Sequence, residues 1–327
     1  MGAGRRIVCA SAWALTMLGL ALTALPASAA FPDKPVRFVV PFPPGGGNDL
    51  VARALAEGMA RDLGQQVIVD NRPGAGTVIG TEYAATRPPD GYTILLASVS
   101  FSVNPSLQPS LPYDPIKSFA PILLLGRYPN VVVVPLDRPY KTMPELIAYA
   151  RANPGRLNYG SFGNGTSPHL SGELFKLLAK VDLTHIPYKG AAPALTDLLG
   201  GRLDVVFSTA SSAGTYVRGG RMRALAVTSA TRAAAYPDLP TIAESGVPGY
   251  EAIAWYGILA PAGTPPEIVA RLNVSITLAA KAESFLKRSA EDGLEIGIEG
   301  PEALTGLLVT EIERWRRVVR EAGMKPD

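Results

Sequence analysis

Two glycine-rich turns stand where an apolar strand leads into a helix start. The first, Gly45–Asn48, follows the run VVPFPP, and the second, Gly163–Ser167, lies in YGSFGNGTSPHL. Glycine tolerates positive φ and lets another group approach the backbone closely. The unpaired N–H groups of a helix start attract anions, by about 0.3–1 kcal/mol for each helix. If the two halves of the chain face each other, both turns point into one cleft, and the pattern predicts an anion-binding site.

Neither turn carries the signature of a nucleotide site. A phosphate-binding loop of the type G-x-x-x-x-G-K-[ST] needs a lysine that both turns lack. A third turn, Gly74–Gly80 (GAGTVIG), comes near the dinucleotide fingerprint G-x-G-x-x-G, but its third glycine falls one position late. We interpret Gly74–Gly80 as a tight turn into a helix.

Serine catalysis has few candidate residues. Ser161 lies near a glycine, but Tyr159 occupies the position where the nucleophile elbow G-x-S-x-G needs glycine. The chain has two histidines. His169 stands in a predicted first helical turn, where it either contacts a ligand or is structural, and His185 lies in an apolar strand, where a core role is favoured. The alternative to a binding protein is an exported α/β serine hydrolase or transferase with Ser161 or Ser98 as nucleophile. Because such a serine needs a base within reach, a structure without a histidine near either serine excludes this alternative.

The sequence also lacks the residue patterns of a metal site and of a nucleic-acid-binding surface. There is no H-E-x-x-H motif and no His, Asp or Glu cluster at metal-ligand spacing, so we expect no catalytic residue, no metal site and no cofactor. Asp204 begins a strand, where turn chemistry is its default role. Lys189 either pairs with an anion or is solvated, and solvation is favoured. The net charge of +3 comes from scattered residues without a basic stripe, which argues against nucleic-acid binding.

Residues 1–29 have the pattern of a secretory signal peptide. Arg5 and Arg6 precede the apolar run Ile7–Leu25, and an A-x-A site ends at Ala29. A membrane anchor is the alternative, but the immediate A-x-A site favours cleavage near Ala29 and a periplasmic product. Cleavage leaves 29 basic and 28 acidic residues, a balance of +1. The single cysteine, Cys9, is lost with the signal, so the mature chain has no disulfide or thiol ligand.

The rest of the chain alternates between short apolar strands and amphipathic helices, a rhythm that predicts parallel-rich sheets flanked by helices. The predicted strands are Val36–Val40, Val67–Val69, Thr93–Ala97, Leu157–Ser161, His185–Tyr188, Val205–Ser208 and Ala224–Thr228. The predicted helices are Asp49–Leu63, Thr77–Thr86, Pro144–Ala152, Pro168–Lys180, Ala191–Leu199, Pro265–Ala282 and Pro301–Ala322.

The rhythm restarts after a long apolar segment, Ile122–Val134, in which we predict two strands. The chain is expected to cross between two domains near Arg127–Asn130 and to return near Ile253–Tyr256, so that both crossings form a hinge. Domain 1 then comprises residues 30–128 and 255–327, and domain 2 comprises residues 129–254.

Several segments together resemble one family, the Bug proteins, which are extracytoplasmic receptors of tripartite tricarboxylate transporters. The similar segments are VPFPPGGGNDLVAR, DNRPGAGTVIG, PDGYTILL, GSFGNGTSPHLSGELF, PYKGAAPALTDLLGGRLDVVF, RALAVTSATRAAAYPDLPTIAESGVPGYE and WYGILAPAGTP. They cover essentially the whole mature chain in order. The resemblance implies an α/β, two-domain periplasmic binding protein of type II-like, Venus-flytrap architecture, with a ligand in the cleft at the hinge. It also implies a monomer that is not an enzyme and that delivers a small carboxylate to membrane components of the transporter.

The resemblance further implies that the carboxylate lies between the two glycine turns and is bound partly through water. The ligand-binding residues carried over by position are Phe42, Gly45, Gly46, Gly47, Asn48, Ser98, Ser100, Asn104, Ser161, Gly163, Asn164, Gly165, Thr166, Ser167, His169, Asp204 and Phe207. Ser98, Ser100 and Asn104 are expected on the loop after strand Thr93–Ala97. Phe162 and the pair Gly47-Asn48 depart from the family pattern, which leaves the choice among amino-acid, di- or tricarboxylate and aromatic ligands open.

Overall fold

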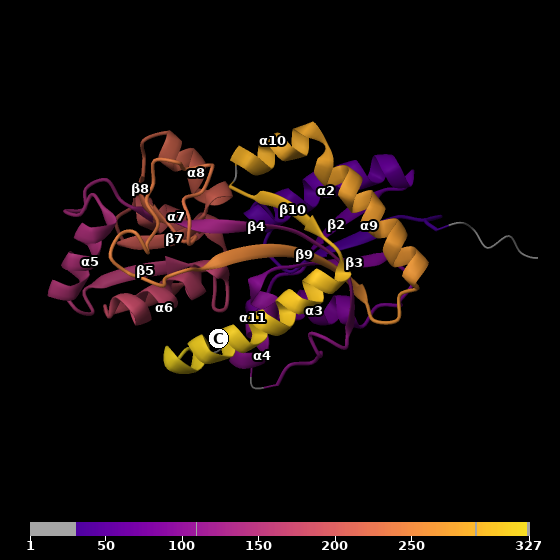
Figure 1. Ribbon diagram of the computed structural model, residues 1–327, viewed down its shortest axis with the longest axis horizontal. Coiled ribbons are helices and arrows are strands. Elements are labelled where there is room, and N and C mark those ends of the chain that lie inside the picture. Colours follow the sequence, from indigo (N-terminus) through magenta and orange to yellow (C-terminus); the bar gives the residue numbers. More distant parts are fainter. Residues whose placement is uncertain (1–30, 109, 292, 326–327) are drawn as a thin grey trace, which may run out of the picture. The chain divides into compact units, whose positions relative to one another are not determined.

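The computed structural model describes residues 31–108, 110–291 and 293–325 (Figure 1). The predicted signal peptide, residues 1–29, lies outside the described residues, and the fold below is that of residues 34–325. It consists of strands joined in two sheets that share one long strand, β4 (Phe119–Val134), with helices packed around them.

The first sheet has the strand order β2-β1-β3-β9-β4, with β10 on the other side of β4. Strands β2, β1 and β3 are parallel, whereas β9 runs antiparallel to both β3 and β4. Its strands besides β4 are β1 (Val36–Val40), β2 (Val67–Asn71), β3 (Thr93–Ala97), β9 (Ile253–Pro261) and β10 (Glu295–Glu299). Its helices are α2 (Gly47–Leu63), the 3-10 turn η1 (Ala75–Thr77), α3 (Val78–Ala85), α4 (Val99–Leu107), α9 (Pro266–Lys281), α10 (Glu283–Glu291) and α11 (Pro301–Glu321).

The second sheet has the order β4-β7-β5-β6, and β8 also pairs with β4. Strand β5 is parallel to β6 and β7, and β4 pairs antiparallel with β7 and β8. Its strands besides β4 are β5 (Leu157–Ser161), β6 (Leu183–Pro187), β7 (Val205–Thr209) and β8 (Arg223–Val227). Its helices are α5 (Met143–Ala152), α6 (Ser167–Ala179), α7 (Ala191–Leu199) and α8 (Ala210–Arg218). The sheets are therefore mixed: parallel at their outer strands and antiparallel along β4 and β9.

The prediction of two strands in Ile122–Val134 is wrong, because β4 is continuous over 16 residues. Gly126 and Pro129, which read as breaks in the sequence, lie within it. Register shifts occur between Pro121 and Leu123 and between Leu124 and Gly126, whereas Pro129 pairs in regular register with Ile253. The two predicted crossings do lie side by side, because Tyr128 pairs with Ala254 in the antiparallel ladder of β4 and β9. In Figure 1 these two strands run together between the two groups of helices. The domain boundaries themselves stay a prediction.

Five strands and α-helices were not predicted from the sequence: α4, α8, α10, β9 and β10. Helix α4, VSFSVNPSL, is buried on most of its surface and contains Pro105, so it has neither an amphipathic stripe nor a helix-forming composition. Thr142 caps α5 by accepting a hydrogen bond from the Glu145 N–H at 3.4 Å.

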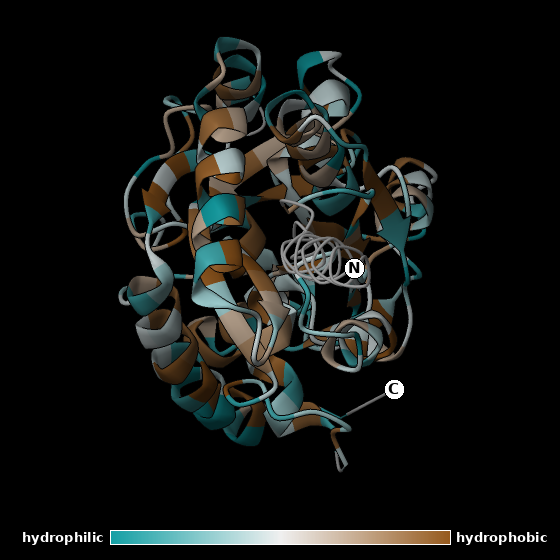
Figure 2. Ribbon diagram, turned by 90° about the vertical axis from the view of Figure 1, so that its right-hand side faces the viewer, coloured by the Kyte–Doolittle hydropathy of each residue, from teal (hydrophilic) through white to brown (hydrophobic). Residues whose placement is uncertain are grey.

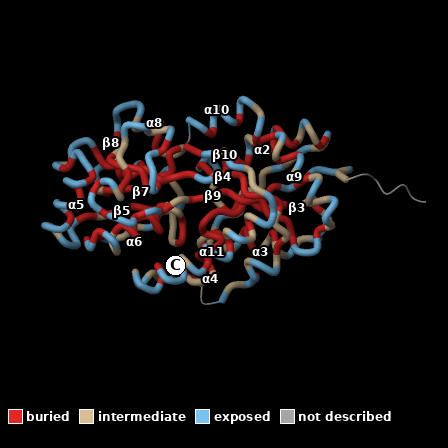
Figure 3. The backbone as a smooth tube through the Cα atoms, viewed as in Figure 1, coloured by how far each residue is buried: buried red, intermediate tan, exposed pale blue. Residues whose placement is uncertain are grey.

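Apolar side chains gather in two clusters, one on each sheet. Phe101, Trp255 and Leu304 belong to the first, and Leu198 and Val206 belong to the second. Figure 3 shows the buried strands surrounded by exposed helices and loops, and Figure 2 shows the helices with mixed hydrophilic and hydrophobic residues. This is the pattern of helices that bury one face against a sheet.

Candidate functional site

A cavity of about 610 Å³ opens beside the carboxyl ends of β1 and β5. This volume lies within the range of small-molecule sites, roughly 300–1,000 Å³. Segments from both sheets contribute to its wall. The lining residues are Pro41, Phe42, Pro43, Pro73, Gly74, Ala75, Gly76, Thr77, Phe162, Gly163, Asn164, Thr166, Pro187, Tyr188, Lys189 and Gly190.

Three helices begin at this cavity. Thr77, Thr166 and Gly190 line it and are the N-cap residues of α3, α6 and α7. At none of these three N-caps does a side chain accept the capping hydrogen bond. The positive ends of three helix dipoles therefore lie at one cavity, an arrangement that stabilises a bound anion.

Lys189 is the one charged side chain among the lining residues. It is exposed, and within the described ranges its ammonium group forms no ion pair. Lys189 immediately precedes the N-cap of α7 at the cavity wall, so its ammonium group lies beside a helix start. A cation and three helix starts supply positive potential without an acidic residue in the wall.

The second glycine turn lines the cavity, but much of its backbone is already hydrogen-bonded. The Gly163 N–H donates to Ser161 Oγ at 3.3 Å and the Gly165 N–H donates to His169 Nδ1 at 3.0 Å. Thr166 Oγ1 donates to the Gly163 carbonyl at 2.6 Å. These bonds hold the turn in one shape rather than leaving its N–H groups free for a ligand.

The first glycine turn, Gly45–Asn48, does not line this cavity, although its neighbours Pro41–Pro43 do. The Gly45 N–H donates to Asp49 Oδ2 at 2.9 Å. A Cβ on Gly47 would lie 2.4 Å from Ser211 Oγ of α8, so this turn packs closely on a helix of the other sheet. The geometry thus differs from the predicted face-to-face arrangement of Gly45–Asn48 and Gly163–Ser167.

Asp49 fixes the shape of the first turn. Burial alone would raise the pKa of its carboxyl, but hydrogen bonds from Arg53, the Gly45 N–H and Asn71 outweigh burial and lower that pKa. Asn48 Oδ1 is buried and has no hydrogen-bond partner among the described residues.

The turn that faces the second glycine turn is Gly74–Thr77, which sequence reasoning dismissed as a tight turn into a helix. A Cβ on Gly76, where φ is +58°, would lie 3.3 Å from the Asn164 carbonyl oxygen. Asn104 Nδ2 holds the turn by donating to the Gly76 carbonyl at 3.0 Å and to Thr77 Oγ1 at 3.1 Å. The sequence signal that could have predicted this turn is the run PGAG, because its glycines allow positive φ and close approach of another backbone segment.

Ser98, Ser100 and Asn104 lie at the start of and within helix α4, and not on a loop as expected. All three are buried. Ser100 Oγ donates to the Gly165 carbonyl at 2.9 Å, which ties α4 to the second glycine turn. These residues therefore support the two facing turns from behind the cavity wall.

Two stacked histidines lie beneath the second glycine turn. The rings of His169 and His185 are 4.0 Å apart at an interplanar angle of 13°. Burial, with the neighbouring imidazole and the Lys176 ammonium, lowers the pKa of His169 to about 2. Burial and the same ammonium lower the pKa of His185 to about 4. Both imidazoles are neutral at pH 7, and each accepts or shares a hydrogen bond with a residue of the turn or its strand.

The serine alternative meets its histidine condition, because His185 Nε2 lies 2.7 Å from Ser161 Oγ. Ser161 is nevertheless fully buried, so no substrate carbonyl reaches its oxygen. The Ser161 hydroxyl also bonds to Gly163. The Ser161–His185 contact therefore supports the turn.

Three further predicted ligand residues lie outside the cavity wall, namely Asp204, Phe207 and Ser167. Asp204 Oδ2 accepts a hydrogen bond from the Asn158 N–H at 2.8 Å, and its Oδ1 lies 3.0 Å from Arg138 Nε in an ion pair. Phe207 is fully buried and packs edge-on against Tyr159. Neither lines the cavity, so the structure gives Asp204 and Phe207 structural roles. Ser167 Oγ donates to Asn130 Oδ1 at 3.4 Å and is likewise outside the lining set.

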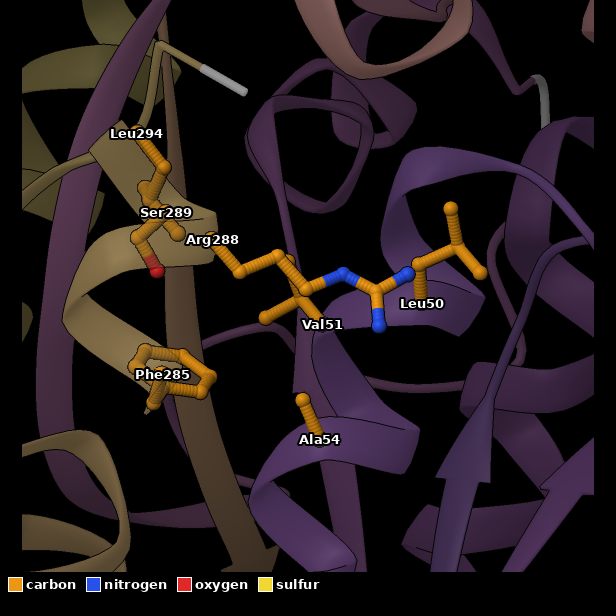
Figure 4. Close-up of a pocket in the computed structure, with 7 residues that line it drawn as sticks. All are labelled: Leu50, Val51, Ala54, Phe285, Arg288, Ser289 and Leu294. Atoms are coloured by element: carbon orange, nitrogen blue, oxygen red, sulfur yellow. The ribbon is translucent and has the colours of Figure 1, made fainter. Parts of the chain in front are cut away.

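Among the residues that the structure describes, neither a metal cluster nor the hollow between α2 and α10 competes with this cavity. In residues 31–108, 110–291 and 293–325, no group of three or more His, Cys, Asp or Glu side chains could hold a metal ion. A hollow between α2 and α10 is drawn in Figure 4, where Arg288 extends from α10 towards α2. Its volume of about 10 Å³ holds at most one water molecule.

Comparison with known proteins identifies the family. The model of the "tripartite tricarboxylate transporter family receptor" matches residues 51–324. The chain belongs to this receptor family. The structure of the periplasmic binding protein BugD superposes on the receptor with a TM-score of 0.85 and 38% sequence identity, over 90% of this chain and 99% of BugD.

Two related structures contain a ligand. The R. palustris protein Rpa4515, solved with adipate, has a TM-score of 0.85 and 38% identity over 90% of this chain and 98% of its own. MatC from Rhodopseudomonas palustris, solved with bound malate, has a TM-score of 0.82 and 34% identity over 88% of this chain and 100% of its own. The predicted resemblance to Bug proteins and the predicted periplasmic-binding-protein fold are thereby confirmed.

The receptor is a periplasmic solute-binding protein and not an enzyme, since its family and its structural neighbours are binding proteins. The hydrolase alternative is therefore wrong, in line with the burial of Ser161. Over the residues that the structure describes, no helix has the length and apolar character needed to span a bilayer.

Proposed function

We propose that the receptor binds a small organic carboxylate in the 610 Å³ cavity. The observation that carries the proposal is the meeting of three helix N-caps, Thr77, Thr166 and Gly190, with Lys189 at one cavity wall that has no acidic residue. Helix starts and an ammonium group both favour a negative charge. The adipate and malate in the structures of two relatives support a carboxylate in particular.

The two facing turns of this site are Gly74–Thr77 and Gly163–Thr166. In this proposal Gly74–Thr77 takes the place that the sequence analysis gave to Gly45–Asn48. Gly76 and Asn164 approach each other closely in the cavity wall. Ser100 and Asn104 support them through the hydrogen bonds described above. Water bridges between the ligand and the turns fit this wall, because several N–H groups of the second turn are already bonded.

The ligand is then passed to the membrane components of a tripartite tricarboxylate transporter, and the receptor acts as a monomer. The two domains close on each other about the paired strands β4 and β9. Domain 1 comprises residues 30–128 and 255–327, and domain 2 comprises residues 129–254. The antiparallel pairing of Tyr128 with Ala254 supports this hinge, since both crossings then bend together. The signal peptide is removed near Ala29, which N-terminal mass analysis of the exported protein tests.

A thermal-shift screen against mono-, di- and tricarboxylates tests the binding proposal, followed by calorimetry with the strongest ligand. A ligand that binds only the folded state raises the melting temperature by mass action. Lys189→Met removes the cavity's charge while keeping most of the side chain's length, and we expect about tenfold weaker binding, or about 1.4 kcal/mol.

Lys287→Met is the matched control, because Lys287 is an exposed lysine of α10 outside the lining set. It should bind as the parent does. If no carboxylate shifts the melting temperature, the proposed ligand class is wrong. If Lys189→Met binds as tightly as Lys287→Met, the proposed anion site is misplaced.

A further inference from the structure

The cavity wall is unusually rich in rings. Phe42, Phe162 and Tyr188 contribute aromatic rings from three separate segments, and prolines occupy four further positions of the wall. The hydroxyl of Tyr188 donates to Asp197 Oδ2 at 2.8 Å, so the part of this side chain left to contact a ligand is its ring. Burial and this bond to a carboxylate raise the pKa of Tyr188 to about 12, so the ring stays uncharged.

Two of these rings are held in place before any ligand arrives. Phe162 and Tyr188 directly follow the paired residues Ser161 and Pro187 of the parallel strands β5 and β6. The Tyr188 N–H donates to the Ser161 carbonyl at 3.1 Å, which locks the two strand ends together. Both rings also pack against the apolar cluster of the second sheet. A preorganised apolar wall binds an apolar group without losing much side-chain freedom.

Positive charge is scarce in the same wall. Of its side chains in the described part of the chain, only Lys189 is charged, and arginine and histidine do not occur among them. A ligand with two or three closely spaced carboxylates would find one ammonium group for all of them, in a wall made mostly of rings, prolines and glycines. Burying a charged or polar group without a partner is costly, so this wall disfavours such ligands.

We infer that the receptor's ligand is a monocarboxylic acid with an aromatic or comparably bulky apolar body. Its carboxylate lies at Lys189 and the helix starts, and its body lies between Phe42, Phe162 and Tyr188. This inference rests on the proposed function, since it names the ligand class for the same cavity.

The test compares 3-phenylpropionate with citrate, malate and the uncharged 3-phenylpropanamide by calorimetry on the mature receptor. We expect 3-phenylpropionate to bind at least tenfold more tightly than each of the other three. Equal or tighter binding of citrate or malate would overturn the inference while leaving the carboxylate site intact. Equal binding of the amide would overturn the inference, because it would show that the site does not require the ligand's negative charge. If none of the acids binds, the proposed function fails as well.

Phe162→Ala then tests the apolar wall directly. It should weaken 3-phenylpropionate binding at least fivefold. Leu286→Ala is the matched truncation control, because Leu286 is an exposed apolar residue of α10, 41% accessible and outside this cavity. It should leave the affinity unchanged. Unchanged affinity in Phe162→Ala, with the melting temperature of the unliganded protein also unchanged, would remove Phe162 from the site.

Discussion

Lowering the pH from 7 to 5 should destabilise this receptor through its two histidines. The mature chain contains no other histidine and no cysteine, so few other side chains titrate in this interval. His169 and His185 stack at 4.0 Å and have pKa values lowered to about 2 and about 4, mainly by burial. In the unfolded chain each imidazole returns to a pKa of about 6.5.

The sign follows from proton counting. Between pH 6.5 and pH 4 the unfolded chain binds protons that the folded protein excludes, so the free energy of unfolding falls as the pH falls. At pH 5 each histidine is almost fully protonated when unfolded and almost fully neutral when folded. Each therefore removes about 2 kcal/mol between pH 7 and pH 5, and the pair removes up to about 4 kcal/mol. That is a large share of a typical stability of about 5–15 kcal/mol.

Urea unfolding at pH 7 and pH 5, at constant ionic strength and without ligand, measures this loss. The parent should lose stability towards pH 5, and His169→Gln/His185→Gln should lose much less over the same interval. Each single variant should fall between the two. A flat profile in the parent, or an undiminished pH effect in the double variant, would refute the reasoning. Ligand affinity should change little over this interval, because His169 stays neutral in the folded protein and still accepts the bond from the Gly165 N–H.

Four further substitutions test the packing of the fold. Asp204→Asn should lower the free energy of unfolding in urea by about 1–3 kcal/mol, because it weakens a charged hydrogen bond, and it should leave ligand affinity unchanged. A loss of affinity without a loss of stability would show that Asp204 contacts the ligand. Gly172→Ala places a Cβ 2.3 Å from the buried Tyr159 ring and should lower the free energy of unfolding by about 1–3 kcal/mol. Gly306→Ala in helix α11 adds a Cβ with no atom within 4 Å and should raise the melting temperature. Thr142→Ala removes the cap of α5 and should cost about 1 kcal/mol by the same unfolding measurement.

The alternating strands and helices were predictable because their signals are local. Strands such as Val36–Val40 and Leu157–Ser161 and the long final helix match their predicted positions, since apolar periodicity and helix capping depend on near neighbours in the chain. The continuous β4 was not predictable, because Gly126 and Pro129 continue the strand through pairing with β9, which is distant in the sequence. Helix α4 was missed because burial on nearly every side removes the amphipathic pattern.

By itself, the sequence determined that glycine turns lead into helix starts and which family the chain resembles. It could not determine which turns meet. The tertiary structure packs Gly47 on α8 and brings Gly76 opposite Asn164, because the choice depends on how separate strands end and how α4 supports the turns. It also draws Phe162, Tyr188 and Lys189 into one wall. Those contacts join residues far apart in the chain, and only the folded sheets bring them within reach of one ligand.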